Sequence, residues 1–248
     1  MHSAQPIALH DHALHGLTKR ERKRLRRQES KKPNRGLSIR SIEPLTPAQE
    51  DTFEAYDNGQ HLLLHGVAGT GKTFISLYLA IQDTLQNQFD KTVLVRSIVP
   101  TRDMGFLPGS AKEKARMYEA PYYGMCSDLF GRGDAYEILK TSHNLEFLST
   151  SFMRGTTIDN ACVIIDECQN MTFHELDSVI TRIGKGCRVI CCGDFRQSDL
   201  GNESGIKSFM SIIRSIRGFT SIEFDAQDIV RGGLVKQYIL SKMNHGMM

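Results

Sequence analysis

The chain has 248 residues, of which 40% are hydrophobic and 24% are charged, a composition typical of a globular protein. No stretch of 18 apolar residues occurs, and the N-terminus lacks the apolar core of a signal peptide, so we expect no membrane span and a cytoplasmic location. The six cysteines form no C-x-x-C pair, which argues against zinc and favours buried free thiols in a reducing compartment.

The net charge of +3 conceals an asymmetry along the chain. Residues 1–40 carry a balance of +8, whereas residues 41–248 carry a balance of −5. The basic residues cluster between Lys19 and Arg27 and continue at Lys31 and Lys32. We therefore expect a basic, flexible arm over 1–40 and an α/β domain over 41–248. The arm could be a solubilising tail, an anchor for the phosphate backbone of RNA or DNA, or a subunit contact.

The first elements after the arm are a helix, a short strand and a second helix. Pro47 at an early helical position predicts a helix that runs to about Tyr56. The apolar run Leu62–Leu64 predicts a buried strand, and the largely apolar residues 74–81 predict a buried helix. The segment between the strand and the second helix therefore has the setting of a phosphate-binding loop.

This loop fits the pattern G-x-x-x-x-G-K-[ST] without a mismatch. It consists of Gly66, Val67, Ala68, Gly69, Thr70, Gly71, Lys72 and Thr73. Glycines allow the backbone N–H groups to converge on phosphate oxygens, and the N-terminus of the following helix adds partial positive charge. We expect Lys72 to reach the β- and γ-phosphates and the Thr73 hydroxyl to bind Mg²⁺.

The remaining pattern alternates strands with helices and predicts a mostly parallel sheet with helices on both faces. The expected elements are a strand at 92–96, an irregular and then helical segment over 97–145, a strand at 145–148, a strand at 161–165, a helix from 173, a strand at 188–192, a helix over 206–217 and a strand at 221–224.

Two acidic residues follow the apolar strand at 161–165. The carboxyl end of such a strand is where α/β sheets place their ligands. Asp166 could hold the Mg²⁺ that bridges the phosphates, and Glu167 could orient or deprotonate the attacking water. The alternative is a strand that simply ends in two solvated acids, an interpretation that the loop upstream makes less favourable.

Polar residues also follow the strand at 188–192. Gln197 is our candidate for sensing the γ-phosphate, because a glutamine can orient water or phosphate without carrying charge. An ordinary turn between strand and helix explains Gly193 and Asp194 equally well.

With these motifs in place, the chain resembles the PhoH-like ATPases, a family named for a phosphate-starvation-inducible protein. The matching stretches are Gln49, the loop at 66–73, Gly105–Gly109, FMRGTTIDN at 152–160, VIIDECQN at 163–170, GDFRQSDL at 193–200 and Asp228–Arg231. They occur in family order over about 45–240. The arrangement is also similar to the first motor domain of superfamily-1 helicases.

The resemblance implies roles for residues that spacing alone does not assign. It implies that Gln49 contacts adenine and that Gln197 couples the γ-phosphate to motion. Arg96, Arg154 and Arg231 match arginines typical of the family. Arg231 and Arg154 are the candidates for an arginine supplied across a subunit interface, or within the same subunit. The resemblance further implies a ring of identical subunits, most naturally a hexamer.

Two functions of different classes are compatible with the sequence. The first is a RecA-like ATPase that hydrolyses ATP with Mg²⁺ and couples hydrolysis to binding or unwinding of RNA or single-stranded DNA. The second is a nucleotide-gated nucleic-acid-binding module with little turnover. The basic arm supports nucleic-acid binding in either case, whereas only the first requires Glu167 to activate water.

Overall fold

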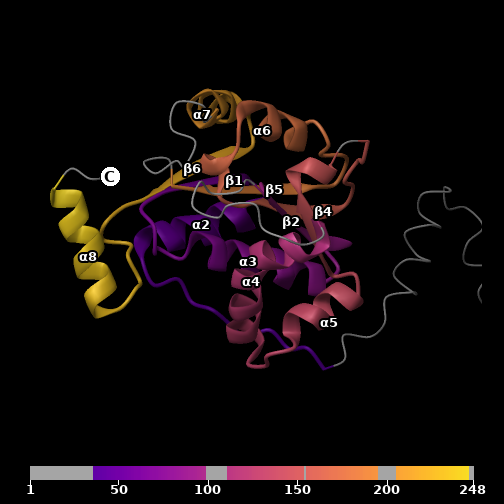
Figure 1. Ribbon diagram of the computed structural model, residues 1–248, viewed down its shortest axis with the longest axis horizontal. Helices are drawn as coiled ribbons and strands as arrows, with labels where there is room; N and C mark the ends of the chain where they lie inside the picture. Colours follow the sequence, from indigo (N-terminus) through magenta and orange to yellow (C-terminus); the bar gives the residue numbers. More distant parts are fainter. Residues whose placement is uncertain (1–35, 99–110, 154, 195–204, 246–248) are drawn as a thin grey trace, which may run out of the picture.

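The computed structural model describes residues 36–98, 111–153, 155–194 and 205–245. Within these ranges a six-stranded sheet lies between two layers of helices (Figure 1). The strands are β1 (His61–Gly66), β2 (Lys91–Arg96), β3 (Leu145–Ser149), β4 (Ala161–Ile165), β5 (Arg188–Gly193) and β6 (Phe219–Phe224). All five strand pairings are parallel. The predicted α/β class and the predicted strands are therefore confirmed.

The helices divide between the two faces of the sheet. They are α2 (Pro47–Asp57), α3 (Lys72–Leu85), α4 (Ala111–Phe130), α5 (Ala135–Thr141), α6 (Phe173–Ile180), α7 (Ile206–Ser215) and α8 (Gly233–Asn244), with 3₁₀ turns η2 (Thr150–Phe152) and η3 (Cys168–Asn170). In Figure 1 the helices α2 to α5 lie below the sheet, and α6 and α7 lie above it. Each layer has its own apolar core.

The strand order β3-β2-β4-β5-β1-β6 places the strand of the phosphate loop beside β5 and β6. Because β5 separates β1 from β4, the carboxyl ends of these three strands form one continuous edge. Leu62 to Leu64 in β1 are completely buried, which explains their unbroken apolar sequence. The fold thus brings the loop at 66–73 and the acids after β4 to the same edge of the sheet.

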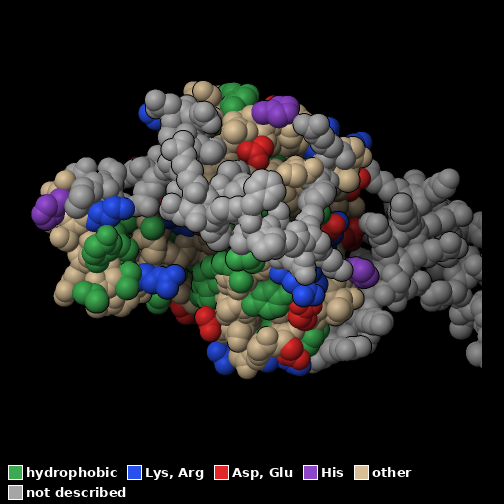
Figure 2. All heavy atoms as spheres, in the orientation of Figure 1, with side chains coloured by type: hydrophobic (Ala, Val, Ile, Leu, Met, Phe, Trp, Pro, Cys, Tyr) green, Lys and Arg blue, Asp and Glu red, His purple; other side chains and the backbone are tan. Residues whose placement is uncertain are grey.

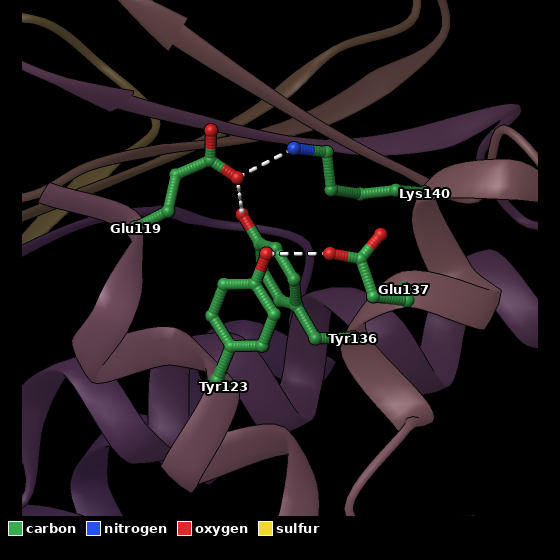
Figure 3. A network of polar contacts seen from close by, with 5 residues as sticks. All are labelled: Glu119, Tyr123, Tyr136, Glu137 and Lys140. Atoms are coloured by element: carbon green, nitrogen blue, oxygen red, sulfur yellow. Dashed lines mark hydrogen bonds and ion pairs between the residues drawn. The ribbon is translucent and has the colours of Figure 1, made fainter. Parts of the chain in front are cut away.

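Helices α4 and α5 form an antiparallel hairpin whose packing includes buried polar contacts. Glu119 on α4 accepts hydrogen bonds from the Tyr136 hydroxyl and the Lys140 ammonium group of α5 (Figure 3). Beside them, the Tyr123 hydroxyl donates to Glu137. These contacts fix α5 against the helix that also lines the nucleotide pocket.

The packed domain includes the last residues of the expected arm. Leu37 is buried in the core cluster beneath the sheet, and the Arg40 N–H donates to the Leu129 carbonyl at 2.9 Å. Residues 1–35, which hold ten of the eleven Lys and Arg residues of the arm, lie outside the described residues.

The sequence did not predict helix α8. It stands apart from the two layers at one side of the molecule (Figure 1), and none of its residues is buried. Among the described residues, no helix combines the length and the apolar character needed to cross a membrane.

Candidate nucleotide-binding site

The loop between β1 and α3 adopts a conformation that depends on its glycines. Gly66 has a φ of +119°, and a side chain at this position would collide with the Phe224 carbonyl at the end of β6. Gly71 has a φ of +86°, and a Cβ there would lie 3.3 Å from the Gln49 side-chain nitrogen. The following turn begins α3 at Lys72, so the N-terminus of a 14-residue helix points its N–H groups at the loop.

Lys72 is folded back onto this loop. Its ammonium group donates to the carbonyl oxygens of Gly66 and Val67 at 3.0 and 2.7 Å, and to the Thr70 hydroxyl at 3.3 Å. Burial lowers the pKa of Lys72, while nearby groups, among them Asp194 and Glu167, oppose this shift. An anion that enters the loop would offer the ammonium group stronger hydrogen bonds than neutral carbonyls do.

The two predicted metal ligands lie in direct contact. The Thr73 hydroxyl donates to Oδ1 of Asp166 at 2.8 Å, and Asp166 is almost fully buried. The other carboxylate oxygen, Oδ2, accepts a hydrogen bond from the Tyr122 hydroxyl at 2.7 Å. Hydroxyl and carboxylate oxygens are the donors that Mg²⁺ prefers, so these residues fit the expected ion.

Glu167 follows Asp166 in a left-handed backbone conformation, with φ 56° and ψ 43°. Burial raises the pKa of Glu167, and the neighbouring Asp166 carboxylate raises it further. The Gln169 amide donates to the Glu167 carboxylate, and its oxygen accepts the Asp194 N–H at 3.0 Å. Gln169 therefore links the acid after β4 to the end of β5, a role that the sequence did not reveal.

Gln49 lies at the base of the loop. Its side chain is 3% exposed, its nitrogen donates to the Thr70 carbonyl at 3.0 Å, and its oxygen accepts the Leu45 N–H at 2.8 Å. Thr46 caps the same helix, as its hydroxyl accepts from the Gln49 N–H. The amide thus holds the loop to the start of α2, and the described part of the chain leaves one of its N–H groups and one of its lone pairs for a ligand.

The C-terminal segment covers the loop from the other side. The Val230 N–H donates to the Gly69 carbonyl at 3.2 Å, and a Cβ on Gly69 would lie 2.9 Å from Cγ of Arg231. Asp228 is buried and accepts from the Ala48 N–H at the start of α2. Arg231 is therefore placed against the loop of its own subunit.

These groups surround one cavity of about 530 Å³, a size that suits a nucleotide. Its lining includes most of the phosphate loop, Gln49, Asp166, Glu167, Asp194 and Arg231. The structure thus brings together the candidates from α2, β1, β4 and the C-terminal segment. Gln197 and Arg154 lie outside the described residues.

The fold and the loop define the class: a P-loop nucleotide-binding protein with a parallel α/β core. Within that class the chain belongs to the PhoH-like protein family, since the model of that family matches residues 41–242. The expected family and fold are thereby confirmed.

Relatives in this family are longer than the chain. It is 35% identical over 203 residues to the PhoH-like protein of Bacillus subtilis (strain 168), covering 81% of this chain and 63% of the relative. It is 32% identical over 231 residues to the PhoH-like protein of Synechocystis, covering 92% and 69%. Protein PhoH of Escherichia coli K12 is 31% identical, with coverage of 77% and 55%. The matched part of the chain thus spans between 55% and 69% of the length of these relatives.

Solved structures with a similar fold include a helicase and an ATPase core. Pif1 helicase from Candida albicans matches with a TM-score of 0.36 and 16% identity, covering 82% of this chain and 44% of the helicase. The Sulfolobus solfataricus SWI2/SNF2 ATPase core in complex with dsDNA matches with a TM-score of 0.41 and 14% identity, covering 75% and 47%.

Proposed function

We propose that the chain is an ATPase that binds ATP together with Mg²⁺ and hydrolyses it. The observation that carries this proposal is the contact between Thr73 and Asp166 at the mouth of an intact phosphate loop. A loop threonine beside an aspartate that follows a strand is the pair that holds Mg²⁺ in P-loop NTPases. Mg²⁺ held by Thr73 and Asp166 would neutralise the negative charge of the bound phosphates.

Each residue of the site has a defined task in this proposal. Lys72 leaves the loop carbonyls and binds the phosphates. Thr73 and Asp166 hold the metal ion. Glu167 accepts a proton from the attacking water or orients it, and its raised pKa makes it a better base than an exposed carboxylate. Gln197, which lies outside the described residues, senses the γ-phosphate.

Gln49 accounts for a preference for adenine. Its remaining N–H and lone pair can serve an acceptor and a donor on the base edge, and adenine offers this pair through N7 and the N6 amino group. A base with a keto group in place of the amino group would mismatch one of the two bonds.

We also propose that ATP turnover is coupled to RNA or single-stranded DNA through the basic arm. The alternative, a nucleotide-gated binding module with little turnover, uses the same site without requiring Glu167 as a base. The buried thiols are consistent with a reducing cytoplasmic location: five of the six cysteines are buried, and all six are free.

A ring of identical subunits, with a hexamer favoured, completes the proposal. Several apolar side chains of α8 are exposed, among them Leu234 at 80% and Tyr238 at 67%, and Figure 2 shows hydrophobic side chains interspersed with Lys on this helix. This helix lies next to the nucleotide pocket, because Ile239 approaches Gly69 of the loop. A second copy that covers α8 would place one subunit beside the ATP site of its neighbour.

The test is ATP turnover with and without single-stranded RNA or DNA, measured for the parent, Lys72→Ala and Glu167→Gln. The ATPase proposal predicts turnover by the parent only, with Glu167→Gln still able to bind ATP and Mg²⁺. Retained hydrolysis in folded Lys72→Ala would reject the site. Negligible turnover by the parent, with nucleic-acid affinity that changes with ATP, would favour the binding module.

A further inference from the structure

Tyr122 on α4 contacts the carboxylate of Asp166, the proposed metal ligand, which lies 44 residues further along the chain. The tyrosine is fully buried, and its hydroxyl donates to Oδ2 of Asp166 at 2.7 Å. The opposite oxygen, Oδ1, accepts from Thr73 at 2.8 Å. The two oxygens of Asp166 are thus assigned to different partners, one toward α4 and one toward the phosphate loop.

We propose that Tyr122 is a positioning residue that fixes the rotation of the Asp166 carboxylate and directs Oδ1 to the metal beside Thr73. This inference rests on the proposed ATPase function. The terminal torsion of an aspartate is soft, so a carboxylate held at one oxygen only can rotate away from the metal. Partners of this kind around metal ligands typically contribute about 10- to 100-fold in metal affinity.

A second contact of the Tyr122 hydroxyl fixes the direction of its hydrogen bond to Asp166. The Arg96 guanidinium, at the end of β2, interacts with the Tyr122 hydroxyl. An arginine can only donate, so the tyrosine oxygen accepts from Arg96 and its single proton goes to Asp166. Strand β2 pairs with β4 up to Val95 and Ile165. The hydrogen bonds from Arg96 to Tyr122 and from Tyr122 to Asp166 therefore connect the ends of two adjacent strands.

If the Tyr122 hydroxyl had a purely structural role, its removal would lower the stability of the fold without changing the affinity for the metal ion. The hairpin of α4 and α5 contains a matched control for this possibility. Tyr136 is also fully buried, and its hydroxyl donates to a carboxylate, Glu119, at 2.8 Å (Figure 3). Glu119 is not among the residues that line the nucleotide pocket.

The experiment compares Tyr122→Phe with Tyr136→Phe. Binding of a fluorescent ATP analogue is titrated with Mg²⁺, and Mn²⁺ binding in the presence of nucleotide is followed by electron paramagnetic resonance. Thermal unfolding shows that each variant is folded. We expect Tyr122→Phe to raise the Mg²⁺ concentration for half-maximal binding by about 10- to 100-fold. Tyr136→Phe should lower the melting temperature and leave this concentration within about twofold of the parent.

A combination of variants tests whether Tyr122 acts through Asp166. Asp166→Asn alone should weaken metal binding, and adding Tyr122→Phe should weaken it no further, because the carboxylate being positioned is already gone. An additive effect of the two changes would overturn the proposal. Equal Mg²⁺ shifts in Tyr122→Phe and Tyr136→Phe, or no shift in Tyr122→Phe, would also overturn it. If the parent itself binds the nucleotide without any dependence on Mg²⁺, the ATPase proposal fails together with this one.

Discussion

Glu167 occupies a backbone conformation that a residue with a side chain adopts at a cost of about 1–3 kcal/mol. The surrounding contacts maintain it: Asp166 is held by Thr73 and Tyr122, and Gln169 holds the Glu167 carboxylate from the next turn. Such local strain is common where a side chain must be presented to a ligand. The strained turn after β4 therefore supports Glu167 as the residue that faces the attacking water.

Replacing Gln169 with leucine should shift the pH dependence of turnover. The Gln169 hydrogen bond favours the ionised form of Glu167 and so opposes the rise in its pKa caused by burial. Without it, the pKa of Glu167 rises further. A base must be ionised, so activity is lost as pH falls through this pKa, and the acid limb of the pH–kcat profile should move to higher pH. At pH values well above the acid limbs of both the parent and the variant, the kcat of the variant should approach that of the parent.

The same variant removes the acceptor of the buried Asp194 N–H, which should lower the free energy of unfolding by about 1–3 kcal/mol. Gln227→Leu is the control, because this exposed glutamine also donates to a carboxylate, that of Asp225, away from the pocket. An acid limb that stays in place in Gln169→Leu would show that Glu167 is not the group whose ionisation limits turnover.

Helix α2 carries Gln49 and is tied to the C-terminal segment through Asp228. One oxygen of this buried carboxylate accepts from the Ala48 N–H at the helix start, and the other accepts from the Asp225 N–H at 2.9 Å. The contact fixes the position of Gln49, the residue proposed to contact adenine, and of the segment that contains Val230. The wall of the pocket formed by α2 thus depends on a residue 180 positions away in the chain.

We expect Asp228→Ala to lower the free energy of unfolding by about 1–2 kcal/mol, the usual effect of losing a helix cap, and to weaken ATP binding. Chemical denaturation and nucleotide titration measure the two effects. Glu54→Ala changes an exposed acid in the middle of the same helix and should alter neither quantity appreciably. If Asp228→Ala is destabilised but binds ATP as tightly as the parent, the contact that holds α2 does not contribute to nucleotide binding.

The elements differ in how well the sequence predicted them. The strands were recognisable because β1, β4 and β5 are buried on both faces and so have continuous apolar sequences. Helix α8 was missed because it buries no residue and its Gly232 cap provides no side-chain hydrogen bond, so neither apolar periodicity nor a capping residue marks it. Tyr122 and Gln169 were missed as site residues because their roles arise from contacts between segments that only the folded chain brings together.

At the scale of the whole molecule, the basic N-terminal segment and the net acidic domain divide the charge of the chain. Because Leu37 and Arg40 belong to the packed domain, a deletion that tests the arm should end at residue 35. Removing 1–35 should leave basal ATP turnover close to that of the parent and weaken nucleic-acid binding. The log–log salt dependence of that binding should flatten by about 0.7–0.9 for every phosphate that the shortened chain no longer neutralises. An identical salt slope with and without the segment would return it to a solubilising role.

In the proposed ring, an arginine of one subunit could complete the ATP site of its neighbour. Arg231 lies against its own Gly69, which supports a role within the same subunit and leaves Arg154 as the candidate supplied to a neighbour. An arginine donated across an interface can accelerate phosphoryl transfer by about 10³- to 10⁵-fold, so its removal should have an effect that is easy to measure. Head-to-tail contacts deliver such a residue to every site of a ring.

Mixing inactive subunits distinguishes the two arginines. When Lys72→Ala is mixed with Arg154→Ala, some interfaces pair an intact loop with an intact Arg154 from the neighbour, so ATP turnover should partly return. When Lys72→Ala is mixed with Arg231→Ala, no subunit holds both an intact loop and an intact Arg231, so turnover should stay low. Recovery in the second mixture would place Arg231 across the interface instead. No recovery in either mixture, together with a monomeric mass by light scattering in the presence of ATP, would reject the ring.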